Sequence, residues 1–372
     1  MSEETPAPDQ VPGAPHPRQT QNLFGQSKAE QAFLSAFNAD RLHHGWMLTG
    51  PQGVGKATLA WRIARFLLAT PEAADDGLFG APPDPVSLDI APDHPVSARL
   101  LAGAEPGLAL ITRSPNDKGK MRNEIVVEDI RKLNRFFGLS ATDGGRRVVI
   151  VDAADEMNTS AANALLKMLE EPPARTTLLL VSHQPSRLLP TIRSRCRTLR
   201  FSPLSPDDMH QALQQAGANS EIETEALTAL ADGSVGAALR LLNLDGLAIY
   251  SEIVGILGTL PRLDRQRAQR LAEAAAQRNA TDKFSLLLDL FDLALARLAR
   301  TGAQGFPPQP PAAEGEAEIM TRLSPTPQSA RLWADLSANV TNRMRHGKAV
   351  NLDPASLVLD TVLKLQETAS RA

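Results

Sequence analysis

Two short segments of the sequence carry residue types that bind nucleotide phosphates. Residues 50–57 read Gly-Pro-Gln-Gly-Val-Gly-Lys-Ala, close to the phosphate-loop pattern G-x-x-x-x-G-K-[ST]. In that pattern the glycines let backbone N–H groups surround the phosphates, the lysine reaches the β- and γ-phosphates, and the last hydroxyl binds Mg²⁺. The hydroxyl is missing here, because Ala57 stands in its place. The sequence keeps the residues of the cradle itself, which are Gly50, Gly53, Gly55 and Lys56.

The second segment is a hydrophobic strand that ends in an acid, since residues 148–152 read Val-Val-Ile-Val-Asp. A working ATPase has at this point an aspartate for the metal and a neighbouring glutamate that polarises the attacking water. Asp152 fits the first role, because parallel α/β folds bind ligands at the carboxyl edge of the sheet. The alternative is that Asp152 caps a helix or turn. Ala153 and Ala154 follow it, so the two segments together favour a nucleotide-binding frame without its catalytic groups.

Composition bounds the class of protein. The 372 residues are enough for two or three domains. A net charge of -3 argues against binding nucleic acid through overall charge. It does not exclude binding through a local basic surface. Cys196 is the single cysteine, which excludes an intrachain disulfide framework and a multi-cysteine zinc site. The sequence shows no signal-peptide pattern and no apolar run of membrane-spanning length, so we expect a cytoplasmic protein without a membrane segment.

The order of expected elements predicts an α/β fold with a parallel sheet flanked by helices, followed by helices alone. Proline and polar residues without apolar periodicity predict a disordered tail over residues 1–21. An acidic, proline-rich stretch predicts a surface excursion over residues 71–95. Strands alternate with helices from residue 22 to residue 202. The strands are expected at 46–49, 108–111, 148–151 and 177–181, and the main helices at 58–68, 127–137 and 159–171. The helical part has a small unit over 203–245 and a larger one over 246–372, with a loop at 302–313 and a last helix beginning at Asp353-Pro354.

Two further motifs indicate a family. Residues 163–173 read Asn-Ala-Leu-Leu-Lys-Met-Leu-Glu-Glu-Pro-Pro, which by physics alone is an amphipathic helix with a proline stop. Residues 189–196 read Leu-Pro-Thr-Ile-Arg-Ser-Arg-Cys. Both resemble signatures of the clamp-loader subunits of bacterial DNA polymerase III, over residues 22–245 and more loosely beyond them. The resemblance implies a RecA-like AAA+ domain over 22–202, a helical lid over 203–245, and a helical collar over 246–372 that assembles with other subunits.

Three departures from that family concern ATP hydrolysis. The hydrolysing members resemble this chain but carry a hydroxyl at the position of Ala57 and a glutamate at the position of Ala153. They also carry an arginine that senses the γ-phosphate at the position of Gly236. Arg240, on the same helix face, is either a substitute for it or a solvated arginine. The departures point to the delta-prime, or stator, branch of the family, with weak or vestigial ATP binding and no hydrolysis.

Arg195 lies in the second family motif, where the resemblance implies an arginine finger. Such a group acts in trans on the γ-phosphate bound to a neighbouring subunit. Ser194 and Cys196 are then expected to position it. The alternative is a basic surface that pairs with acids or DNA phosphates, comprising Arg187, Arg193, Arg195, Arg197 and Arg200. Cys196 as a nucleophile is disfavoured, because no histidine and base accompany it.

The resemblance also implies partners and cofactors. The partners are the other clamp-loader subunits in a pentameric ring and, through the complex, the sliding clamp and primer-template DNA. Contacts to DNA phosphates from Lys118, Lys120 and Arg122 are one interpretation of that basic stretch, and a solvated loop is the other. Many members insert a four-cysteine zinc module between the first helix and the second strand. Residues 70–107 contain no cysteine, so we expect no zinc and no required cofactor.

Two other functions stay open at this point. The first is a self-sufficient ATPase motor of the same family, in which Thr58 and either Asp155 or Glu156 replace the missing groups. The second is a phosphate-loop kinase or regulator that acts on a small molecule and joins no ring. ATP turnover by the isolated chain distinguishes the first alternative, and co-purification with clamp-loader subunits distinguishes the second.

Overall fold

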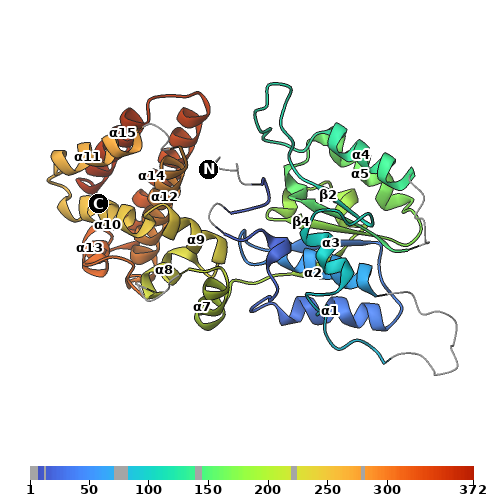
Figure 1. The fold of residues 1–372 in the computed structure, drawn as a ribbon. Helices are drawn as coiled ribbons and strands as arrows, with labels where there is room; N and C mark the ends of the chain where they lie inside the picture. Colours follow the sequence, from blue (N-terminus) through green and yellow to red (C-terminus); the bar gives the residue numbers. More distant parts are fainter. Residues whose placement is uncertain (1–6, 12–13, 71–82, 139–144, 219–223, 278–280) are drawn as a thin grey trace, which may run out of the picture. The chain divides into compact units, whose positions relative to one another are not determined.

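The computed structural model describes the chain except for residues 1–6, 12–13, 71–82, 139–144, 219–223 and 278–280. The chain divides into two compact units (Figure 1). The first comprises Met1–Ala218 with Gly233–Gly236, and the second comprises Asn219–Asp232 with Ala237–Ala372. The lid expected over 203–245 is therefore shared between them. Its helices are α7 (Pro206–Gln215) in the first unit, α8 (Thr224–Ala231) in the second, and α9 (Val235–Asn243), which begins in the first unit and continues in the second.

The first unit is built on a five-stranded sheet in the order β2-β3-β4-β1-β5, and all its pairs are parallel. The strands are β1 (Gly45–Thr49), β2 (Leu108–Ile111), β3 (Arg147–Asp152), β4 (Thr176–Ser182) and β5 (Arg197–Arg200). This confirms the predicted α/β class. The sequence did not predict β5, because this edge strand buries only Leu199 and has no apolar pattern.

Helices cover both faces of the sheet, with α4 and α5 on one side and α1 to α3 on the other (Figure 1). They are α1 (Ser27–Asn38), α2 (Lys56–Ala69), α3 (Pro95–Leu101), α4 (Val127–Gly138), α5 (Thr159–Glu170) and the short α6 (Pro190–Arg193). Val149 and Val151 pack into the core beneath α4 and α5. On the other face Trp46 contacts Phe33 of α1, with ring centroids 5.1 Å apart. Burial on both faces explains why the strands read as continuous apolar runs.

The N-terminal residues depart from the expected disordered tail. Pro17–Gln19 form a 3-10 turn, η1, and the His16 ring caps it by accepting from the Arg18 N–H at 3.1 Å. His16 is only 6% exposed. The prediction is wrong for residues 14–19, because capping and contacts with distant residues order them where apolar periodicity is absent. The rest of that prediction falls partly on residues 1–6 and 12–13, and the expected surface excursion partly on 71–82, which lie outside the described residues.

The described residues of the second unit form helices and connecting loops, and no strand is found among them. Its further helices are α10 (Gly246–Thr259), α11 (Arg265–Ala275), α12 (Thr281–Gln304), α13 (Glu316–Leu323), α14 (Pro327–Ala349) and α15 (Pro354–Ala369). Helix α12 packs against α10, α13 and α14, and α15 packs against α11 and α14. Asp353 caps α15 by accepting from the Ser356 N–H at 2.9 Å, as predicted. The loop expected from residue 302 begins later, because α12 continues through Gln304.

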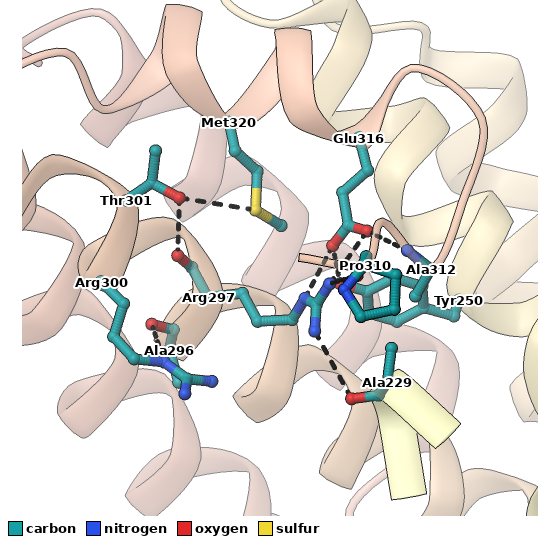
Figure 2. Close-up of polar contacts among 10 residues, drawn as sticks. All are labelled: Ala229, Tyr250, Ala296, Arg297, Arg300, Thr301, Pro310, Ala312, Glu316 and Met320. Carbon is teal, nitrogen blue, oxygen red and sulfur yellow. Dashed lines mark hydrogen bonds and ion pairs between the residues drawn. The ribbon is translucent and has the colours of Figure 1, made fainter. Parts of the chain in front are cut away.

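A buried ionic network holds the chain entering α13 (Figure 2). Glu316 has no exposed surface, and its carboxylate accepts from Arg297 Nε at 2.8 Å. The Tyr250 hydroxyl and the Ala312 N–H donate to the same carboxylate. Arg297 also donates to the Pro310 carbonyl at 3.1 Å. Each charge in this network has several partners, which a buried ion pair requires in order not to destabilise the fold.

Among the described helices, none is long and apolar enough to cross a membrane by itself, and α9 with α10 reaches that length only as a bent pair.

Candidate functional site

The predicted phosphate loop joins β1 to α2, as its sequence requires. It lies between Thr49, the last residue of β1, and Lys56, the first residue of α2. Gly53 and Gly55 have φ values of +78° and +97°, in the left-handed region that only glycine enters at little cost. Left-handed glycines of this kind occur in loops that bind phosphate, so the residues present fit a nucleotide in this respect.

Lys56 is buried at the base of this loop. Its Nζ donates to the Gly50 carbonyl at 2.7 Å and also to the Pro51 carbonyl. Burial lowers the pKa of Lys56 to about 8, while Asp152 and Asp155 act in the opposite direction. The lysine that would reach a bound phosphate is thus hydrogen-bonded to the loop itself.

Asp152 lies at the end of β3, on the same carboxyl edge of the sheet as the loop. Burial, together with the nearby carboxylates of Asp9 and Glu156, raises its pKa to about 7 against the opposing charge of Lys56. The structure therefore brings Lys56 and Asp152 together, as the two motifs predicted. The proximity of Asp9 was not expected.

The two acids that the motor alternative requires are both engaged elsewhere. The Asp155 carboxylate accepts from the backbone N–H groups of His183 at 2.9 Å and Gln184 at 3.2 Å. Glu156 Oε2 pairs with Arg113 Nε at 3.0 Å. These contacts connect the end of β3 to the end of β4 and to the loop after β2. They disfavour either residue as the group that orients a water for hydrolysis.

His183 is a site residue that the sequence reasoning missed. It follows β4 at the carboxyl edge, and burial together with the charge of Lys56 lowers its pKa to about 4, so its ring is neutral at pH 7. Its Nδ1 and the Ser182 Oγ are buried without a hydrogen-bond partner among the described residues. Both atoms are of the kind that meets a polar ligand. The signal for them was the polar run directly after a buried parallel strand.

The turn that contains Gly236 packs directly on the phosphate loop. The Gly236 N–H donates to the Gly53 carbonyl at 3.1 Å, and the Ser234 hydroxyl donates to the Gln52 carbonyl at 2.7 Å. A Cβ atom on Gly236 would lie 2.9 Å from the Gly53 Cα. Glycine at this position therefore has a structural reason. Arg240, considered as a substitute for the missing arginine, instead pairs with Asp289 at 2.6 Å.

The Arg195 turn lies at the opposite edge of the sheet. A Cβ placed on Gly45, the first residue of β1, would be 3.1 Å from the Arg195 carbonyl and 3.3 Å from Cys196 Sγ. The phosphate loop follows the other end of β1. A strand of five residues separates these two edges by about 16 Å at roughly 3.3 Å per residue. Arg195 and the chain's own phosphate loop are therefore two separate sites.

The Arg195 side chain is partly exposed and weakly held. Its Nη2 lies 3.0 Å from Glu170 Oε1, and its Nη1 donates to the Thr191 carbonyl at 3.1 Å. The Ser194 hydroxyl donates to the same carbonyl at 3.1 Å, which fits a positioning role. Burial raises the pKa of the Cys196 thiol to about 12, so this cysteine stays protonated and is a poor nucleophile.

The basic stretch after β2 forms a small loop. Arg122 donates to the Ser114 hydroxyl at 3.0 Å and to the Pro115 carbonyl at 2.7 Å, so part of its donor capacity is already used. Lys118 and Lys120 are exposed, and their backbone N–H groups both donate to the Asn116 side chain. Contact with DNA phosphates remains a prediction for the two lysines.

The part of the chain that the structure describes contains no group of three or more His, Cys, Asp or Glu side chains arranged to hold a metal ion. Residues 71–82, within the stretch where the family's zinc module would lie, are outside that part.

Comparisons with known proteins identify the family. The family model described as "DNA polymerase III, delta subunit" matches residues 25–205. The DNA polymerase III subunit delta' of Pseudomonas aeruginosa is 34% identical over 258 residues, covering 66% of this chain and 70% of that protein. The chain belongs to the DNA polymerase III delta-prime family. This confirms the family that the two sequence motifs indicated.

More distant members of the same group match a shorter part of their own length. The subunit delta' of Escherichia coli is 32% identical, covering 58% of this chain and 59% of that protein. The subunit gamma of Buchnera aphidicola is 26% identical, covering 61% of this chain and 58% of that protein. The chain thus spans less than two thirds of the length of these two relatives.

Proposed function

We propose that this member of the delta-prime family is the stator subunit of a clamp loader in the cytoplasm. It assembles with the other clamp-loader subunits into a pentameric ring, which loads the sliding clamp onto primer-template DNA. Within the ring it presents Arg195 to ATP bound by a neighbouring subunit. It hydrolyses no ATP itself, binds nucleotide weakly or not at all, and requires neither zinc nor another cofactor. The names of its relatives, delta' and gamma subunits of DNA polymerase III, support membership of such an assembly.

The observation that carries the proposal is the placement of Arg195 at the amino edge of the sheet, away from the chain's own phosphate loop. A nucleotide that Arg195 contacts there would be one held by another subunit. Its side chain is 38% exposed, and its Glu170 partner is 45% exposed. An ion pair between exposed groups is worth only about 0.2–1 kcal/mol. A neighbour's γ-phosphate, which offers bidentate contacts, would therefore displace Glu170 at little cost.

The chain's own loop supports the absence of hydrolysis. Gly53, Gly55 and Lys56 would hold a nucleotide's phosphates, and the neutral His183 ring would offer a further polar contact. A bound nucleotide would supply its negatively charged phosphates as acceptors for the N–H groups of the loop. The groups required for chemistry are absent or engaged, because Asp155 accepts two backbone hydrogen bonds and Glu156 pairs with Arg113. The site therefore serves binding at most.

The test of the proposal is a reconstituted loader that contains Arg195→Ala. We expect the ring to assemble and the DNA-stimulated ATPase to fall, because an arginine finger contributes about 10³–10⁵ to the rate at the one site it serves. Arg193→Ala is the matched control, since Arg193 is an exposed arginine two residues away. An Arg195→Ala loader that hydrolyses ATP at the wild-type rate would refute the assignment.

Two measurements separate the alternatives. Steady-state ATP turnover by the isolated chain, abolished by Lys56→Ala, would establish the motor alternative instead. Failure to co-purify with other clamp-loader subunits would favour a kinase or regulator that acts alone. The mass of the reconstituted complex gives the stoichiometry of the ring directly.

A further inference from the structure

The N-terminal residues make contacts that no apolar pattern predicts. The Asp9 side chain is 1% exposed, and one of its carboxylate oxygens lies 3.1 Å from His16 Nε2. The His16 ring meets the ring of Trp61 on α2 edge to face, with centroids 5.6 Å apart. Arg65, also on α2, donates to the Arg18 carbonyl at 2.8 Å. Residues 7–11 and 14–18, which we call the N-terminal segment, are thus attached to the helix that begins with Lys56.

The same segment reaches the phosphate loop. A Cβ on Gly236 would lie 3.5 Å from a methyl group of Val11 and 2.9 Å from the Gly53 Cα. Val11 and the phosphate loop therefore both contact the turn that contains Gly233 and Gly236, which we call the glycine turn. Asp9 is close enough to Asp152 for its charge to raise the pKa of that carboxyl. The segment therefore extends from the glycine turn past Asp152 to the side of α2.

This placement brings the Asp9 carboxylate within electrostatic range of Asp152, the acid at the carboxyl edge that also interacts with Lys56. Asp152 is close enough to interact electrostatically with both Asp9 and Glu156, and Glu156 is paired with Arg113. The Lys56 Nζ, the nearest cation of the phosphate loop itself, is bonded to loop carbonyls. The like charge of a triphosphate is repelled by buried carboxylates, and this repulsion is stronger away from bulk water. Both the space beside the glycine turn and the local charge therefore oppose a nucleotide.

We propose that the N-terminal segment is a built-in cap that covers the phosphate loop and excludes nucleotides from it. The cap acts through the Asp9 carboxylate, the Val11 contact at the glycine turn, and the attachment of His16 to Trp61. The cap proposal rests on the proposed function, in which this subunit does not hydrolyse ATP. It adds a cause for weak nucleotide binding that lies outside the two degenerate motifs. The intrinsic cradle is retained, so opening the cap restores affinity.

The test compares full-length chains for binding of a fluorescent ATP analogue with Mg²⁺. In the double variant Asp9→Asn with His16→Ala, we expect binding about tenfold tighter than in wild type, because a state that is closed most of the time lowers apparent affinity by its open fraction. Asp117→Asn, which removes an exposed aspartate from the loop after β2, is the matched control and should bind as wild type does. A double variant that is folded and binds no more tightly than wild type would overturn the cap.

A second measurement decides the matter if the double variant fails to fold. Hydrogen exchange on the wild-type chain should show slow exchange for the amides of residue 50 and residues 52–56, which the cap shields. Exchange there as fast as in an unfolded chain would overturn the proposal, and slow exchange would support it. ATP turnover measured in the same samples separates the two proposals. Turnover by wild type would overturn the stator function, whereas unchanged affinity without turnover would overturn only the cap.

Discussion

Replacing Gly236 by alanine sets two effects of opposite sign against each other. Gly236 lies in the first turn of α9, and alanine in a helix is favoured over glycine by up to about 1 kcal/mol. The new Cβ would lie 2.9 Å from the Gly53 Cα, 3.5 Å from a methyl group of Val11 and 3.9 Å from the Gly53 carbonyl carbon. The neighbouring atom belongs to backbone, which cannot rotate away as a flexible side chain does. The turn and the phosphate loop would have to separate.

The structure gives the size of the opposing cost. Forcing an extra carbon into a close-packed contact costs about 1–3 kcal/mol. Separation also weakens the bonds from the Gly236 N–H to the Gly53 carbonyl and from the Ser234 hydroxyl to the Gln52 carbonyl. Each such bond contributes about 1 kcal/mol. After subtraction of the gain in helix propensity, we expect a net destabilisation of about 2 kcal/mol.

Thermal unfolding of the full-length chain measures this balance. A loss of about 2 kcal/mol lowers Tm by roughly 4–8 °C for a unit of this size. Gly138→Ala is the matched control, because a Cβ there, at the end of α4, would meet no atom within 4 Å. That variant should melt at or slightly above the wild-type temperature. If Gly236→Ala also melts at or above it, the structural reason for glycine in this turn is refuted.

Three further predictions follow from buried groups. Asp152 binds its proton more tightly in the folded chain, with its pKa raised from 3.8 to about 7, so its ionisation makes stability fall as pH rises between these values. Asp152→Asn removes that decline, and its gain in Tm should be larger at pH 8 than at pH 5; a gain that shrinks with pH would contradict the assignment. Glu316→Ala leaves the Arg297 guanidinium buried without its counter-charge, which should cost about 3–5 kcal/mol in urea unfolding, and a loss below about 1 kcal/mol would show that the network relaxes freely. Cys196, with a pKa raised to about 12 by burial, should react with a thiol reagent at pH 8 far more slowly in the native chain than in urea, and equal rates would rule out the burial described here.

Much of the first unit was predictable because its signals are local. Strand β2 and the start of α5 lie where the apolar patterns place them, and the phosphate loop follows from glycine spacing within eight residues. The elements that were missed lack such a signal. Strand β5 exposes three of its four residues, and η1 forms in a proline-rich stretch that apolar periodicity cannot detect. His183 was missed because its burial depends on what packs around the end of β4.

The sequence by itself determined the parallel α/β class, the place of the glycine-rich loop, and the presence of alanine at positions 57 and 153, since each depends on residues close together in the chain. Only the tertiary structure decided how the remaining groups are used. It places Arg195 at the far edge of the sheet from the phosphate loop, and it engages Asp155 with the end of β4. It also packs Ser234 onto Gln52, which lies 182 residues earlier in the chain. Contacts across such separations depend on how whole elements pack, and no local spacing of residue types records them.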